Sequence, residues 1–164
     1  MGKPTFLLSF LALLCVGTLA QQNASGGTGA DSFLGTWKLN IENSSKGPTA
    51  GTITIEPEGK KYKITLELAY PGGFGGAAWT VTDMNGRGSP VTRNFNKAIA
   101  EEWHVKREGV DSFTILAVFR AAGAGGQEEW RYKVGPDGKT LTRRVVSGGP
   151  PDHRNQVLVF EKTP

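Results

Sequence analysis

The chain has 164 residues, of which 21% are charged and 38% are hydrophobic, so its composition excludes a disordered chain and suits one globular domain. The 23 glycines and 9 prolines follow no Gly-X-Y period and disfavour a helical bundle. The formal net charge of +4 comes from basic residues scattered along the chain rather than clustered. We therefore expect a solvated basic surface and no nucleic-acid partner.

Residues 1–20 have the three-part pattern of a secretory signal peptide. Lys3 supplies a positive charge, residues 6–16 form an apolar run, and Thr18 and Ala20 are the small residues that precede a cleavage site. The apolar run is too short to cross a bilayer as a permanent helix, and no later stretch is apolar enough. We expect cleavage after Ala20 and a soluble secreted or periplasmic protein without a membrane span.

The only cysteine, Cys15, lies within the predicted signal peptide. The mature chain would therefore have no disulfide, thiolate metal site or cysteine nucleophile, and its core alone would have to stabilise it. Residues 21–31 are rich in Gly, Ser, Asn and Gln and predict a flexible lead-in. We assign residues 32–164 to a single domain.

Apolar residues alternate with polar ones along residues 32–164, which predicts strands. Residues 61–70 give the clearest example, and all four tryptophans, including Trp79, fall on the apolar positions. The dipeptides Asn85-Gly86 and Asp137-Gly138 are typical of hairpin turns, and the spacing leaves no room for crossover helices. The pattern predicts an all-β protein, a single antiparallel up-and-down β-barrel of 8–10 strands.

Residues 94–102 allow two interpretations. Phe95, Ile99 and Trp103 are four apart, and Asn94 could cap a short helix. However, residues 101–106 resemble residues 128–133, where the strand pattern is clear. We therefore predict a strand here.

Residues 33–39, Phe-Leu-Gly-Thr-Trp-Lys-Leu, resemble the Gly-X-Trp signature that opens the first strand of lipocalins and fatty-acid-binding proteins. The chain also resembles short secreted bacterial proteins of unassigned activity, which carry the Asp-Gly-Lys-Thr-Leu-Thr motif found here at residues 137–142. The resemblance implies a calycin-type barrel.

The same resemblance implies structural roles for two early residues and one late one. Gly35 and Trp37 would be core residues, with Trp37 plugging the closed end of the barrel. A late arginine would pack over this indole, and Arg143, Arg144 and Arg154 are all candidates.

The chain has few candidates for a catalytic or metal site. His104 and Glu102 share one face of a strand, but no third metal ligand is identifiable, so we favour an exposed charge pair and expect no metal. His153 lies in a proline-rich loop, where we expect it to be exposed. Residues 73–78 match a dinucleotide-binding pattern, but a strand follows where that motif needs a helix, so we expect no cofactor.

Two pairs of adjacent glutamates, 101–102 and 128–129, would each divide between the two faces of a strand. One member of each pair could point inward beside a tryptophan and become a perturbed carboxylate of the kind enzymes use. We favour solvated strand ends instead. We therefore expect no catalytic residue and a protein that is not an enzyme, with an inward carboxylate as the exception.

Arg143 shares its register with the apolar Leu141 and Val145. If that face is the interior, Arg143 could hold a ligand carboxylate, as fatty-acid-binding proteins do with inward Arg and Tyr. Tyr132 would supply the phenol, and Trp103 and Trp130 would lie beside the ligand. The alternatives are an inward Arg144, an Arg143 at the rim or over Trp37, or a protein carboxylate, Glu102 or Glu129, as the partner of Arg143.

Two functions remain open. The first is an exported barrel that binds a small, mostly apolar ligand, with an apolar acid as one candidate. The second is a structural or surface-interaction protein whose bulky side chains fill the barrel and leave no room for a ligand. The oligomeric state does not follow from the sequence.

The predicted signal peptide has a direct test. Protein isolated from its native host should begin near Gln21, because cleavage after Ala20 removes the positive and apolar segments. N-terminal sequencing measures this. A mature protein that retains Met1 would contradict the prediction.

Overall fold

The computed structural model describes residues 31–121 and 124–164. The predicted signal peptide, and the predicted lead-in apart from Asp31, lie outside these residues. Within them, no helix is long and apolar enough to span a membrane. Two short 3-10 helices, η1 (Pro71–Gly73) and η2 (Pro151–His153), accompany eleven strands: β1 (Gly35–Asn40), β2 (Ala50–Glu58), β3 (Lys61–Ala69), β4 (Gly75–Thr82), β5 (Asn85–Pro90), β6 (Thr92–Arg93), β7 (Ala100–Arg107), β8 (Ser112–Ala121), β9 (Ala124–Val134), β10 (Thr140–Gly148) and β11 (Val157–Lys162).

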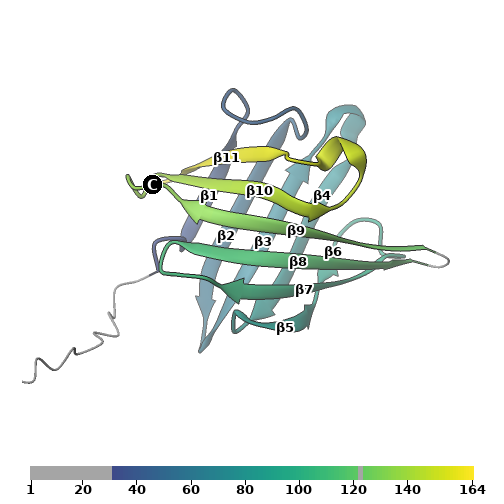
Figure 1. Cartoon of the computed structure of the whole chain (residues 1–164), viewed down its shortest axis with the longest axis horizontal. Helices are drawn as coiled ribbons and strands as arrows, with labels where there is room; N and C mark the ends of the chain where they lie inside the picture. Colours follow the sequence, from purple (N-terminus) through teal and green to yellow (C-terminus); the bar gives the residue numbers. More distant parts are fainter. Residues whose placement is uncertain (1–30, 122–123) are drawn as a thin grey trace, which may run out of the picture.

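All strands belong to one antiparallel sheet that is nearly closed into a barrel (Figure 1). The first and last strands, β1 and β11, pair with each other, which leaves β5 and β6 at the two edges. These edge strands are consecutive in sequence: β5 pairs with β7, β6 pairs with β4, and only Val91 separates them. Residues 85–93 therefore act as one closing strand that changes partner at Val91.

The predicted all-β, up-and-down barrel is confirmed. The structure divides it into eleven strands rather than 8–10, because the closing strand is interrupted at Val91. The interrupted segment remains hydrogen-bonded to both neighbouring strands. Val91 N–H donates to Glu101 O of β7 (3.0 Å), and Thr80 Oγ1 of β4 donates to Pro90 O (2.8 Å).

The predicted inward position of Trp79 is wrong. In β4 the buried residues are Ala78, Thr80 and Thr82, whereas Trp79 is half-buried on the outer face. The reason is the register with β3, in which Ala78 lies opposite the inward Leu66. Residues directly opposite each other in a sheet share a face, so the pairing places the larger indole outside despite its apolar character.

The strand predicted for residues 94–102 is only partly correct. β7 begins at Ala100, and residues 94–99 form turns and bends instead of either a strand or a helix. Asn94 caps no helix, since none follows it, and its side chain accepts a hydrogen bond from Ala77 N–H (2.8 Å) instead. Its own backbone N–H donates to Ala77 O (3.1 Å), which extends the contact with β4.

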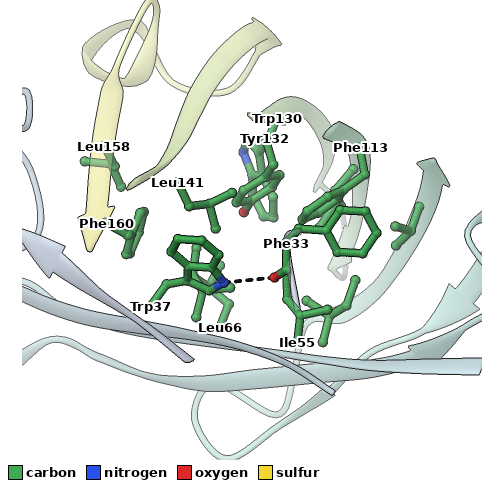
Figure 2. Packing of buried hydrophobic residues seen from close by; sticks show 14 of the residues in the cluster. Phe33, Trp37, Ile55, Leu66, Phe113, Trp130, Tyr132, Leu141, Leu158 and Phe160 are labelled. Atoms are coloured by element: carbon green, nitrogen blue, oxygen red, sulfur yellow. Dashed lines mark hydrogen bonds between the residues drawn. The ribbon is translucent and has the colours of Figure 1, made fainter. Parts of the chain in front are cut away.

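One end of the barrel is filled by packed aromatic side chains (Figure 2). Trp37 is fully buried, and its Nε1 donates a hydrogen bond to Phe33 O (2.9 Å). The Phe33 ring meets the edge of Phe113 at a centroid distance of 5.3 Å, and Phe113 stacks on Tyr132 at 4.6 Å. Such contacts bury large apolar areas and close this end to water.

Polar contacts seal the outside of this plug. Asp31, the last residue of the predicted lead-in, is buried; it forms an ion pair with Arg107 and accepts a hydrogen bond from Tyr62 Oη (2.7 Å). The barrel domain therefore begins at least one residue before the predicted boundary at residue 32. The arginine side chain also lies over the ring of Phe33, at 5.9 Å from its centroid.

The cation over Trp37 is a lysine rather than one of the three candidate arginines. Lys162 lies opposite Trp37 in the β1–β11 ladder, and its Nζ is 5.0 Å from the indole centroid. Gly35 has a φ of 124°, and a Cβ at this position would meet Lys162 Cε at 3.1 Å. Arg144 and Arg154 are exposed, and Arg143 lies over Trp130 instead.

Replacement of the plug tryptophan tests this packing. Trp37→Ala should lower the free energy of unfolding by about 3–5 kcal/mol, the usual cost of truncating a fully buried aromatic side chain. Trp79→Ala is the matched control and should cost less, since Trp79 is half-buried on the outer face. Urea unfolding measures both, and an equal or smaller loss for Trp37→Ala would contradict the assigned plug.

Candidate functional site

The other end of the barrel contains a cavity of about 1000 Å³. It lies where β3, β8 and β10 end and β4, β7 and β9 begin; in Figure 1 this is the end opposite the C-terminus. The wall from β3 and β4 is apolar, and small residues line much of the mouth, including Gly75, Gly76, Gly126, Gly148 and Gly149. The sequence left open a barrel whose interior is completely filled by side chains. At this end of the barrel the interior is not filled.

Arg143 points into the cavity from β10, as the first of the sequence interpretations proposed. It is only 4% exposed, and its guanidinium carbon is 4.3 Å from the Trp130 ring centroid. Its Nε and Nη1 are buried without a hydrogen-bond partner. Among the described residues, no carboxylate oxygen lies within 4.0 Å of this guanidinium.

The proposed protein partners of Arg143, Glu102 and Glu129, lie on the outer face instead. Each makes its contacts there: Glu102 with Arg120 at 3.8 Å, and Glu129 with Ser147 Oγ at 3.2 Å. The neighbouring glutamates, Glu101 and Glu128, are the ones buried on the cavity side. The favoured interpretation of solvated strand ends is therefore wrong for one member of each pair.

Glu101 makes one hydrogen bond and one ion pair at the mouth of the cavity. Its Oε1 accepts a hydrogen bond from Trp103 Nε1 (2.5 Å), and its Oε2 lies 2.9 Å from Arg93 Nε. The Arg93 guanidinium also covers the ring of Phe95, at 4.5 Å from its centroid. Burial raises the pKa of the Glu101 carboxyl, and this effect exceeds the opposing influence of the Trp103 hydrogen bond and the Arg93 charge.

Glu128 is less completely satisfied. It is 4% exposed, and its Oε1 lies 3.5 Å from His153 Nδ1. Neither of these two atoms has a hydrogen-bond partner. His153, which we expected to be exposed, is half-buried at the cavity mouth because η2 brings it next to the buried Glu128.

Three of the four predicted ligand-binding residues, Arg143, Trp103 and Trp130, line the cavity. Tyr132 does not: it stacks on Phe113 below the cavity, 2% exposed, and burial raises the pKa of its phenol to about 12. Tyr70 lines the cavity in its place. The alternation of apolar and polar residues along residues 61–70 predicted that Tyr70 faces inward. Its position at the same end of the barrel as Arg143 depends on the pairing of strands that are distant in the sequence.

His104 and Glu102 form a half-buried pair on the outer face rather than the exposed pair expected, with His104 Nε2 3.6 Å from Glu102 Oε1. His104 Nδ1 also lies 3.3 Å from Gly86 O. Within residues 31–121 and 124–164, no group of three or more His, Cys, Asp or Glu side chains is arranged to hold a metal ion.

Comparison with known proteins identifies no relative of this chain. It matches no family model, no curated protein and no solved structure. The interpretation of the cavity therefore depends on its own residues.

The buried Glu101 carboxyl predicts a pH-dependent contribution to stability. Its pKa in the folded protein lies above the unfolded value of about 4.5, so its stabilising contribution is fully present below that pH and is lost as the pH rises. Between about pH 4 and pH 7, the free energy of unfolding of the wild type should therefore fall relative to that of Glu101→Gln. Urea unfolding measures the difference, and a relative rise would contradict the raised pKa.

Proposed function

We propose that this protein binds a small, largely apolar organic acid in the cavity, without catalysing a reaction. The acid group would lie at Arg143, and the apolar body would extend toward the mouth. The observation that carries this proposal is a guanidinium that is buried, has unpaired donors and has no carboxylate within 4.0 Å among the described residues.

A buried charge without an ionic partner is costly, and an anion that enters the cavity offsets this cost. A carboxylate suits arginine because its two oxygens accept parallel hydrogen bonds from the planar guanidinium. Trp130 Nε1 is also buried without a partner, on the indole that Arg143 covers. Nε and Nη1 of Arg143 and Nε1 of Trp130 are therefore buried donors without a partner, and a small shift of the side chains that cover them would open them to an incoming anion.

The charges around the cavity favour the same class of ligand. Glu101 is paired with Arg93, and Glu128 lies beside His153, so Arg143 is the cavity-lining cation without a close anionic partner among the described residues. The apolar part of a ligand would meet side chains such as Leu66, Leu68, Phe119 and Trp103. A volume of about 1000 Å³ is at the upper end of the range for small-molecule sites.

The fold supports this proposal at a more general level. A barrel with one packed end, one open end and a Gly-X-Trp motif at residues 35–37 resembles lipocalins and fatty-acid-binding proteins. We include a calycin-type family assignment in the proposal for this reason. The predicted signal peptide supports a secreted or periplasmic location.

Titration with decanoate tests the binding of an apolar acid. Decanoate should quench tryptophan fluorescence as it fills the space beside Trp103 and Trp130, and its affinity should fall by about tenfold or more in Arg143→Gln, equivalent to about 1.4 kcal/mol. Decanol should bind more weakly than decanoate, because it cannot accept two charge-assisted bonds from the guanidinium.

Arg144→Gln is the matched control, since Arg144 is the next residue along β10 and faces solvent. It should leave the affinity for decanoate unchanged. Circular dichroism confirms that each variant is folded. The absence of decanoate binding at hundreds of micromolar, or equal affinities in Arg143→Gln and Arg144→Gln, would contradict the proposal.

A further inference from the structure

The cavity contains an acceptor as well as donors. On the inner face of β9, Glu128 and Trp130 occupy successive inward positions, two residues apart. Two residues of a strand span roughly 7 Å, and the Arg143 guanidinium lies over the Trp130 ring. The carboxylate of Glu128 is therefore one inward step closer to the mouth than the indole that Arg143 covers.

Of the two inward carboxylates, Glu128 has the greater capacity for a ligand, because the described residues donate no hydrogen bond to it, whereas in Glu101 only Oε2 lacks one. Glu101 already receives a hydrogen bond from Trp103 and contacts Arg93. Glu128 Oε1 is buried and unpaired, and the nearby His153 Nδ1, at 3.5 Å, is unpaired as well. A buried acceptor without a donor is unfavourable, so a donor brought by a ligand would be bound more tightly than an apolar group.

The backbone at the cavity mouth fits closely around this carboxylate. Gly149 has a φ of 69°, and a Cβ at this position would lie 2.9 Å from Glu128 Cδ and 3.0 Å from its Oε1. The glycine allows the β10–β11 connection to pass against the carboxylate. Glu128 is consequently held in a defined place rather than free to turn into solvent.

We propose that the ligand is an acid that also carries a hydrogen-bond donor, a hydroxyl or an amino group, a few carbons from its acid group, and that Glu128 accepts this donor. The inference rests on the proposed function and narrows its ligand class from apolar acids to hydroxy or amino acids with an apolar chain. A site with separate donor and acceptor groups rejects a ligand lacking the matching group, because the buried polar atom then stays unpaired.

The probes are decanoate and its derivatives with a hydroxyl or an amino group on carbon 3 or carbon 5. The two positions place the donor at two different distances from the acid group, and the two groups distinguish a neutral donor from a charged one. At least one derivative should bind about tenfold more tightly than decanoate in the fluorescence titration, a difference of about 1.4 kcal/mol.

Glu128→Met tests whether this preference comes from the carboxylate, because methionine has a similar length and no strong acceptor. In this variant the derivatives should lose their advantage. Decanoate itself should bind at least as tightly as in the wild type, since a negative charge near the acid group has been removed. A purely structural role of Glu128 would weaken all the acids together.

Glu129→Gln is the matched control, because Glu129 is the adjacent residue on the outer face. It should preserve the preference for the derivatives. Glu128→Gln keeps a neutral acceptor and should retain part of the preference, which provides a second variant if Glu128→Met does not fold.

The possible failures are distinguishable. If no acid binds to the wild type, the proposed function fails, and this inference fails with it. If decanoate binds with an affinity that depends on Arg143, but all derivatives bind no better than decanoate, the function stands and the role of Glu128 is overturned. A preference that survives in Glu128→Met overturns it as well.

Discussion

The closure of one sheet determines the positions of the side chains that form the proposed binding site. The β1–β11 ladder joins the first and last strands, and residues 85–93 connect the remaining edges through β4 and β7. Once the sheet curves into a barrel, each strand residue faces either the interior or the outside. Interior residues must then either pack against one another or line a space.

The two ends of the interior illustrate these two outcomes. Around Trp37 and Phe33, aromatic rings pack closely, and the indole N–H satisfies its hydrogen-bonding capacity on Phe33 O. At the other end, Arg143 and Glu128 bring charges into a cavity and leave polar atoms unpaired. The packed end supplies apolar burial that can offset the cost of the buried charges.

Neighbouring residues of the same strand face opposite sides of the barrel wall, so the two members of a like-charged pair have different environments. Arg143 is buried beside Trp130 while Arg144 is exposed, and Glu128 is buried while Glu129 makes its contact on the outer face. A shift of one residue in the register of β9 or β10 would exchange these positions and move the charges out of the cavity. The ladder between β9 and β10 is therefore part of the proposed binding site.

The sequence by itself determined the strand pattern, the single-sheet barrel and the inward positions of Trp37, Trp103 and Trp130, because alternation with period two is a local property of each strand. It also identified Arg143 as an inward candidate, since its neighbours two positions away, Leu141 and Val145, are apolar. The strand pattern and the inward positions are statements about one strand at a time, and the single sheet follows from the turn signals and short connections between neighbouring strands.

Only the tertiary structure decided which residues meet across the barrel. Trp79 faces outward because the register with β3 places Ala78 opposite Leu66, and Lys162 covers Trp37 because β11 pairs with β1. Likewise, Arg93 reaches Glu101 from the end of β6, and His153 reaches Glu128 from η2, two short elements whose positions no periodicity describes. Pairing and closure join residues that are distant in the chain, and their geometry depends on the whole sheet rather than on any local pattern.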